Sequence, residues 1–398
     1  MDRMRRVFFW GGSEDQAKLN WVAWQKVVAP VEYGGLGIGS LRDANLAMLS
    51  KWWWRFKEDE SGLWKRVIWA IHSNGRGWNF IPTKLTIPGP WKQVAKAVAE
   101  IQRAGVAVEK SIIAIVGRGY SVMFWLDYWV GDETLAIRFP ALFALEKKKM
   151  AAVSDRWLGG SLGWNWEWRR AISDGVEAAQ LVQLVGLLNG FGRSHMKDEW
   201  RWALDGSRKF TVGSIKEGLI KQRFSDPEYV LNWNNWVPKK VGILTWRACL
   251  DRLPTRCALV RRNINMPNCL CPMCGEEQED TEHLFVTCSF AQMIWQLVTQ
   301  WCKIQPIYAF RVRDLLDLHQ YVGGSAKFKK AFQAICHTVF WCIWRCRNEV
   351  IFEQGHCSLQ KVIGEIKGLS FLWIKARSKQ LNLDWSIWSS FNMHRLGW

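Results

Sequence analysis

Apolar residues recur every three or four positions in several long stretches of this chain, which is the spacing of an amphipathic helix. The clearest N-terminal stretch runs from Leu41 to Phe56, and Ser40 with Asp43 resembles the capping box that begins a helix. A second helix is expected from Trp91 to Arg103. Near the C-terminus the same period continues from Phe328 to Val350. Helices are therefore predicted at both ends of the chain.

Two other regions show the apolar character and alternation of β-strands. The apolar runs Ile112–Val116 and Val122–Trp125 are separated by glycine and serine residues, which predicts a first hairpin. The segment Trp200–Leu204 alternates, Asp205 and Gly206 turn the chain, and Phe210–Val212 alternates again. An Asp-Gly turn between alternating segments is a strong signal for a second β-hairpin.

Helical signals dominate the region after this second hairpin. Ser214 and Glu217 have the spacing of a capping box, and Val241–Leu250 keeps helical spacing. Thr255 is placed to cap a helix that ends near Arg262, and Ser289 to cap one with an apolar stripe that ends at Trp301. The chain is thus expected to have a mostly helical α+β fold, with a small helical domain preceded by a β-hairpin and with separate N-terminal and C-terminal helical segments.

Three cysteines and one histidine within this helical region form a compact motif. Cys271, Cys274, His283 and Cys288 follow one another in the order C-x2-C-x8-H-x4-C. Thiolates and imidazoles are the ligands of tetrahedral zinc, and a CxxC pair on a tight turn, which Gly275 would favour, offers two sulfurs to one ion. Four protein ligands leave no open position for water. The motif therefore predicts one structural Zn²⁺ ion rather than a hydrolytic centre.

Other uses of the cysteines stay open at this point. The four residues can be ordinary buried cysteines plus a surface histidine, since the chain has eleven cysteines. Cys269 lies two residues before Cys271 and can replace it as a ligand. Cys342 and Cys346 lie one helical turn apart and can bind a metal with His337 or with a partner helix, although free cysteine commonly packs as a small hydrophobe. The odd count, the uneven spacing and the lack of a secretion signal argue against disulfides.

The composition indicates which class of partner the chain binds, and it argues against a membrane-spanning helix. Lys and Arg total 54 against 36 Asp and Glu, a formal net charge of +18 in 398 residues, which favours polyanionic partners. The uncharged stretch Ala331–Trp344 is shorter than a bilayer requires, and the N-terminal apolar run is short for a signal peptide. We therefore expect an intracellular protein with DNA or RNA as the first candidate partner and with no small-molecule substrate.

The chain also contains 29 tryptophans, which can serve packing or recognition. Trp164, Trp166 and Trp168, followed by Arg169 and Arg170, can stack on the bases of a single strand. Their alternation also places the three rings on one side of a strand, which is typical of a buried face. Core packing is the interpretation that this alternation favours.

The charges around the cysteine and histidine motif separate into a basic stretch and an acidic loop. Between Lys239 and Asn263 a single acid, Asp251, accompanies seven basic residues, Lys239, Lys240, Arg247, Arg252, Arg256, Arg261 and Arg262. The loop between the expected ligands carries five acids, Glu276, Glu277, Glu279, Asp280 and Glu282. We predict that the basic residues contact phosphates, and that the loop faces away or contacts a basic protein surface. The alternative is a solvated basic face whose arginine stems cover apolar surface.

Three segments of the chain resemble the reverse-transcriptase zinc-binding domain, zf-RVT, of plant non-long-terminal-repeat retrotransposons and the genes derived from them. They are WALDGSRKFTV from Trp202, VPKKVGILTWRACLDRLPT from Val237 and CPMCGEEQEDTEHLFVTC from Cys271. Upstream, FFWGG from Phe8, WVAWQKVVAPVEYGGLGI from Trp21 and WLDYW from Trp125 resemble segments that follow the polymerase in those elements. Downstream, WCIWRCRNEVIF from Trp341 resembles the trailing helix of the family.

The resemblance implies the same four zinc ligands and a division of the chain into four segments. These are a post-polymerase helical segment (1–60), a Trp-rich mixed connection region (61–195), the reverse-transcriptase zinc-binding domain (196–305) and a C-terminal helical region (306–398). The chain lacks the Tyr-x-Asp-Asp and Phe-x-Asp-Asp signatures of the polymerase, and Asp127 and Asp132 are isolated. Nothing resembles an endonuclease or a full ribonuclease H carboxylate set. We therefore expect no catalytic residue.

The function expected from these observations is that of a non-catalytic zinc-binding module of a protein related to RNA-directed DNA polymerases, which binds DNA or RNA without sequence specificity. The alternatives are a protein-interaction or assembly module that docks a retroelement or host protein, and a decayed retroelement fragment without a selected function. The resemblance also suggests the nucleus, although the chain contains no basic run of five residues that would support nuclear import.

Overall fold

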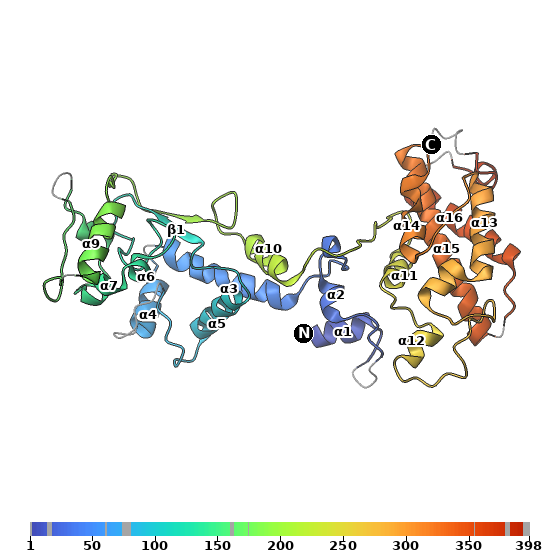
Figure 1. Ribbon diagram of the computed structural model, residues 1–398, viewed down its shortest axis with the longest axis horizontal. Helices are drawn as coiled ribbons and strands as arrows, with labels where there is room; N and C mark the ends of the chain where they lie inside the picture. The colour runs from blue at the N-terminus through green and yellow to red at the C-terminus, as the bar shows by residue number, and fades with distance from the viewer. Residues whose placement is uncertain are drawn as a thin grey trace. The chain divides into compact units, whose positions relative to one another are not determined.

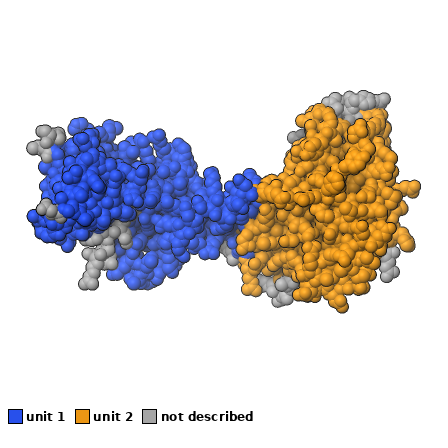
Figure 2. All heavy atoms as spheres, in the orientation of Figure 1, with its two compact units in different colours: residues 1–2, 28–33, 37–226 blue, residues 3–27, 34–36, 227–398 orange. Residues whose placement is uncertain are grey.

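The computed structural model describes residues 2–13, 18–59, 62–73, 81–159, 163–173, 175–353, 355–378 and 383–392. The chain divides into two compact units, which Figure 2 shows in different colours. The first unit comprises residues 1–2, 28–33 and 37–226, and the second comprises residues 3–27, 34–36 and 227–398. The expected zinc-binding segment 196–305 thus contributes its first part to one unit and the remainder to the other, so the compact units differ from the four expected segments.

Two long helices pack against each other in the first unit. The helix expected after Ser40 is α3 (Leu41–Glu58), and the Ser40 hydroxyl accepts a hydrogen bond from the Asp43 N–H at 3.2 Å, as the capping box predicts. The helix expected at 91–103 is α5 (Pro90–Arg103), which packs against α3. The other helices of this unit are η1 (Val31–Tyr33), α4 (Leu63–His72), α6 (Leu135–Arg138), α7 (Pro140–Leu145), α8 (Val153–Arg156), α9 (Val176–Leu187) and α10 (Val212–Arg223). All but one residue each of α1 (Asp2–Phe9) and α2 (Trp24–Val28) belong to the second unit.

The first expected hairpin, between 112–116 and 122–125, is wrong. Strand β1 (Ile112–Ile115) instead pairs in antiparallel fashion with β2 (Glu199–Trp202), so that Ile112 lies opposite Trp202. The cause lies in the loop after β1, whose backbone N–H groups at 117, 119 and 121 donate to the Asp198 carboxylate at 2.7 to 2.9 Å. The loop therefore wraps around the residue that precedes β2 instead of returning as a strand.

The second expected hairpin is correct only in its turn. After β2 the chain turns back, and the Trp202 N–H donates to the Arg208 carbonyl at 2.9 Å. The described residues form no strand after this turn, because α10 begins there. The Thr211 hydroxyl caps this helix by accepting a hydrogen bond from the Ser214 N–H at 3.1 Å. Ser214 thus lies inside α10 rather than at its N-cap, and its hydroxyl accepts from the Trp202 indole at 2.8 Å. The fold class itself, a mostly helical α+β fold with a small antiparallel strand pair, is confirmed.

The three alternating tryptophans pack against a core of the first unit. Trp166 stacks between Trp164 and Trp168, with ring centroids 6.2 and 5.6 Å apart. These rings also contact Phe124 and Trp125, two fully buried side chains. Because their faces are used within the protein, the structure favours packing over stacking on nucleic-acid bases.

A bundle of helices around α15 (Ala326–Phe352) forms the second unit (Figure 1). Helix α15 contacts α11 (Lys239–Cys249), α14 (Val312–Tyr321), α16 (Leu359–Ser378) and α13 (Ser289–Cys302). The remaining elements after residue 226 are α12 (Arg256–Val260), the π-helical turn η3 (His283–Thr287) and α17 (Trp385–Ser389). The rings of Phe285 and Phe340 stack with centroids 4.5 Å apart, so the cysteine and histidine motif and the C-terminal helices share one hydrophobic core.

Several of the helices in this bundle match the periodicity of the sequence. Thr255 caps α12, since its hydroxyl accepts from the Ala258 N–H at 3.3 Å, and the expected helices at 241–250 and 328–350 are α11 and α15. None of the described helices combines the length and apolar character that crossing a bilayer requires.

The cysteines of α15 have structural roles. Cys342 is fully buried, which is the packing role that its helical position favours. The Nδ1 atom of His337 lies 3.0 Å from the Thr245 hydroxyl, and no metal-binding group that includes His337 occurs among the described residues. Cys346 and Cys357 form a disulfide with Cα atoms 5.9 Å apart, which corrects the expectation that all cysteines are reduced.

Candidate metal centre

Cys271 and Cys274 lie on a tight turn of the backbone. The Cys271 N–H donates to the Glu277 carbonyl at 2.7 Å, and the Gly275 N–H donates to the Cys271 carbonyl at 2.8 Å. Gly275 has a φ of 75°, a left-handed conformation that glycine adopts without steric cost. The segment CPMCG therefore folds so that both thiols belong to the same site, as the CxxC spacing predicts.

His283 and Cys288 come from η3, directly before α13. The Asp280 carboxylate accepts the His283 N–H at 2.7 Å, and the Cys288 N–H donates to the His283 carbonyl at 2.8 Å. A π-helical turn of this kind is rare and is often found at functional sites. Cys288, rather than Ser289 as expected, occupies the N-cap position of α13.

The structure brings together the ligand atoms of Cys271, Cys274, His283 and Cys288, which all lie within 4.8 Å of one another. The Sγ atoms of Cys271 and Cys288 are 3.9 Å apart, and the Cys274 Sγ lies 3.3 Å from the His283 Nε2. Tetrahedral zinc with Zn–S bonds of about 2.3 Å places its sulfurs about 3.8 Å apart. The donor set and its spacing therefore fit a zinc ion. Cys274 is half-buried and the other three are buried.

Cys269, the alternative ligand, lies outside this group of four. Its side chain lines a pocket together with Cys257 of α12, and the Cys269 carbonyl accepts the Glu279 N–H at 2.7 Å. The backbone thus directs Cys269 toward α12 and Cys271 toward the metal group. Sequence spacing alone left this choice open.

Two side chains that the sequence did not single out as metal-site residues orient the imidazole of His283. Its Nδ1 atom lies 2.9 Å from the Glu277 carboxylate and 3.1 Å from the Thr287 hydroxyl. An imidazole that donates its Nδ1 proton to a carboxylate presents Nε2 to a metal, and this pairing raises the basicity of the ligand. The only sequence signal for this role was the acidic character of the loop. It did not distinguish Glu277 from the other acidic residues as the partner of His283.

The thiols of Cys271 and Cys288 share a hydrogen bond that shifts their pKa values in opposite directions. It raises the pKa of Cys271, to which burial also contributes, and it lowers the pKa of Cys288. Zinc binding would displace the thiol protons of both residues, because the metal-bound form of cysteine is the thiolate.

The acidic loop does not face solvent as a uniform surface. Glu279 is fully buried and forms a bidentate ion pair with Arg347 of α15, at 2.6 and 2.8 Å. The Glu282 carboxylate accepts the Val312 N–H at the start of α14, at 2.6 Å. The contact with a basic protein group that the sequence suggested for this loop is thus made within the same chain.

The seven basic residues expected to bind nucleic acid have different surroundings. Four are exposed, Lys239 and Lys240 at the start of α11, Arg252 and Arg261, and Arg261 pairs with the Asp251 carboxylate at 3.1 Å. Arg247, Arg256 and Arg262 are half-buried.

These half-buried guanidinium groups make contacts within the chain. Arg247 and Arg262 lie over the ring of Trp21, at 5.7 and 4.5 Å from its centroid, and Arg256 donates to the Leu270 carbonyl at 2.8 Å. Burial lowers the pKa of Arg247 to about 10. The binding of phosphate by any of the seven stays a prediction.

Comparison with known proteins agrees with these features. Residues 210–295 match the protein family described as zinc-binding in reverse transcriptase. The chain is 24% identical over 363 residues to a protein of Arabidopsis thaliana named as a ribonuclease H protein, a match that covers 89% of this chain and 56% of that protein. It is also 28% identical over 128 residues to an uncharacterised mitochondrial protein of Arabidopsis thaliana, covering 32% of this chain and 79% of the relative.

The chain therefore spans about half the length of the ribonuclease H-named relative. No solved structure matches the chain. The matched range includes all four ligand residues, so residues 210–295 carry a zinc-binding domain of the kind found in reverse transcriptases.

Proposed function

We propose that Cys271, Cys274, His283 and Cys288 hold one Zn²⁺ ion with a structural role. The observation that carries this proposal is the closure of the site, since four protein ligand atoms lie within 4.8 Å of one another and three of the four residues are buried. A zinc ion with four protein ligands has no position for a reacting water. The ion would tie the turn at 271–275 to the N-terminus of α13.

Metal analysis of the purified chain tests this proposal. The wild type is expected to hold about one zinc per chain under reducing conditions, and Cys274→Ser to lose it. Cys269→Ser is the matched control, because its thiol lies outside the metal group, and it should keep the zinc. A wild type without bound zinc, or a Cys274→Ser variant that retained the full amount, would refute the assignment.

We further propose that this zinc-stabilised scaffold binds DNA or RNA through its phosphates and without sequence specificity. The exposed cations Lys239, Lys240, Arg252 and Arg261 and the net charge of +18 support the proposal. Phosphate contacts of this kind release counterions, so affinity falls as the salt concentration rises, with a slope of about 3 to 4 for four contacts. The half-buried Arg247, Arg256 and Arg262 would then contribute to the scaffold.

Fluorescence anisotropy with a labelled oligonucleotide at increasing salt concentration tests this binding. Replacing Lys239 and Arg252 together by glutamate should weaken binding and reduce the salt slope, whereas Lys96→Glu, at an exposed position of α5 in the first unit, is the control. Absence of binding at low ionic strength would refute the proposal. Unchanged affinity in the double variant would favour the alternative, a protein-interaction module.

The proposed role is non-catalytic. Because one Arabidopsis relative is named as a ribonuclease H protein, the chain has to be tested for cleavage of RNA. The metal-binding group found among the described residues consists of three thiols and one imidazole, a set that favours zinc over the Mg²⁺ of nucleotidyl chemistry. Incubation of the chain with an RNA–DNA hybrid and Mg²⁺ is therefore expected to yield no cleavage. Cleavage by the wild-type chain would refute the proposal.

A further inference from the structure

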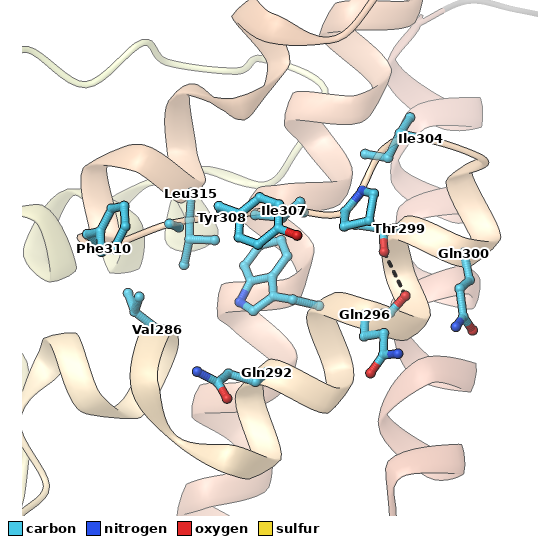
Figure 3. Close-up of a pocket in the computed structure, with 13 residues that line it drawn as sticks. Val286, Gln292, Gln296, Thr299, Gln300, Ile304, Ile307, Tyr308, Phe310 and Leu315 are labelled. Atoms are coloured by element: carbon cyan, nitrogen blue, oxygen red, sulfur yellow. Dashed lines mark hydrogen bonds between the residues drawn. The ribbon is translucent and has the colours of Figure 1, made fainter.

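A pocket of about 450 Å³ lies between α13, the segment 304–310 and the start of α14 in the second unit (Figure 3). Its volume is within the range that small ligands and single bases occupy. Figure 3 shows Gln292, Gln296 and Gln300 following one another along α13, with Tyr308 and Phe310 on the segment across from them. The pocket does not include the metal group or any of the seven basic residues discussed above.

Two aromatic residues at this pocket are largely exposed. The side chains of Tyr308 and Phe310 are each 84% exposed, and within the described part of the chain neither ring packs against another aromatic ring. Exposed rings are costly in water, and such residues commonly mark a binding surface. A free ring face accepts a nucleobase by stacking, which contributes about 1 to 3 kcal/mol per base.

The three glutamines provide hydrogen-bonding groups along the same pocket. They are spaced four residues apart, so they lie along one face of α13, and all three are exposed. Among the described residues no partner hydrogen-bonds to their side-chain amides, which can therefore both donate to and accept from a ligand. Amides of this kind pair with base edges, and their oxygen can accept the 2′-hydroxyl that distinguishes RNA from DNA.

The charge of the surrounding chain suits a polyanion. Between Glu282 and Asp314 the sequence contains no acidic residue, whereas it contains Lys303, Arg311 and Arg313. Lys303 and Arg311 are exposed, while Arg313 pairs with Glu228 at 3.0 Å. The Lys303 ammonium donates to the Asn392 side chain at 2.8 Å, and the Asp314 carboxylate accepts the Phe310 and Arg311 N–H groups at 2.9 Å. Lys303 and Arg311 adjoin the pocket segment in sequence, and such exposed cations are complementary to the phosphates on either side of a bound base.

We propose that this pocket binds an unpaired base of single-stranded RNA, with Tyr308 and Phe310 as stacking surfaces and the glutamine amides at the base edge and the ribose. The inference rests on the proposed nucleic-acid binding and adds to it a second surface that takes single strands. A duplex has no free base to offer, so the pocket would distinguish single-stranded from double-stranded RNA. The exposed Lys239, Lys240, Arg252 and Arg261 would bind either form.

The test compares the full chain with its Tyr308→Ala and Phe310→Ala variants. The probe is a labelled RNA strand of about twelve nucleotides without self-complementarity, used alone and annealed to its complement, with a DNA strand of the same sequence alongside. Each variant is expected to lose about five-fold or more in affinity for the single RNA strand and to keep its affinity for the duplex. Phe352→Ala removes a ring that is 76% exposed outside the pocket, and it should bind like the wild type.

The outcomes separate this inference from the one on which it rests. If the wild type binds neither form at low ionic strength, the proposed function fails and the pocket proposal fails with it. If the wild type binds RNA and both pocket variants bind the single strand equally well, only the pocket proposal is overturned. Tighter binding of the DNA strand through these rings, or a concentration-dependent dimer that Phe310→Ala disrupts without changing RNA affinity, would also overturn it.

Discussion

Glu279 and Arg347 form a bidentate ion pair in the interior of the second unit, with side chains 0% and 3% exposed. Glu279 belongs to the loop between the metal ligands, and Arg347 belongs to α15. The same carboxylate accepts the Arg256 backbone N–H at 2.7 Å, and Arg347 also donates to the Pro254 carbonyl at 3.2 Å. This pair therefore connects the metal loop, the start of α12 and the central helix of the bundle.

Removing one partner of this pair leaves an uncompensated charge in the interior. We expect Arg347→Ala and Glu279→Ala each to lower the free energy of unfolding by about 3 to 5 kcal/mol. Urea denaturation followed by circular dichroism measures this loss. Arg345→Ala, on the same helix and 41% exposed, is the control and should cost much less.

A double-mutant cycle isolates the interaction itself. If Glu279 and Arg347 act through each other, the double variant should lose less than the sum of the two single losses. Additive losses would show instead that each residue stabilises the unit through its other contacts.

The Glu277 carboxylate beside His283 gives a prediction about metal affinity. Glu277→Gln keeps the size of the side chain but removes the charge that supports the imidazole, so zinc affinity should fall about 10- to 100-fold. Competition with a chromophoric chelator measures the change. Glu276→Gln alters the exposed neighbouring carboxylate and should leave the affinity unchanged. Equal affinities for the two variants would mean that Thr287 alone suffices to orient the ring.

The helices and the metal group were largely predictable from sequence, and the reason is that their signals are local. Leu41–Phe56 carries the period of α3, and Cys271 and Cys274 lie on a turn that their own spacing specifies. The pairing of Ile112 with Trp202 was not predictable in this way, because its determinant is the hydrogen bonding of a loop to Asp198, far along the chain.

The same limit applies to the charged residues. Arg347 in WCIWRCRNEVIF and Arg345 two positions before it have similar sequence surroundings, yet one is buried and one is not. Only the packing of α15 against the metal loop determines which arginine meets Glu279. The seven basic residues near the motif likewise differ in exposure because Trp21, which lies far from them in sequence, covers two of them.

The carboxylate of Asp198 makes the stability of the first unit depend on pH. Burial opposes its ionisation, but hydrogen bonds from the Ser121, Gly119 and Gly117 N–H groups outweigh this effect and lower the pKa of Asp198 below its usual value. A carboxylate with a lowered folded-state pKa stabilises the fold above its unfolded pKa of about 3.9, and this contribution is lost as the pH falls through the folded value.

Thermal unfolding of Asp198→Asn between about pH 3 and pH 6 tests this linkage. The variant should be less stable than the wild type at the upper end of this range, and the difference should shrink as the pH falls. Asp226→Asn, at an exposed position of the same unit, is the control. A difference that stayed constant over the whole range would mean that the charge of Asp198 does not contribute.

Gly117 provides the most direct test of the strand pairing, because its surroundings consist of backbone. A Cβ at this position would lie 2.2 Å from the Met196 carbonyl oxygen and 2.5 Å from that of Lys197, atoms that cannot move without displacing the segment before β2. We expect Gly117→Ala to lower the free energy of unfolding of the first unit by about 2 kcal/mol or more. Gly192→Ala, where a Cβ meets no atom within 4 Å, should change it little. Denaturation of both variants, monitored by tryptophan fluorescence, distinguishes the two cases, and equal stabilities would contradict the close approach of the loop to residues 196 and 197.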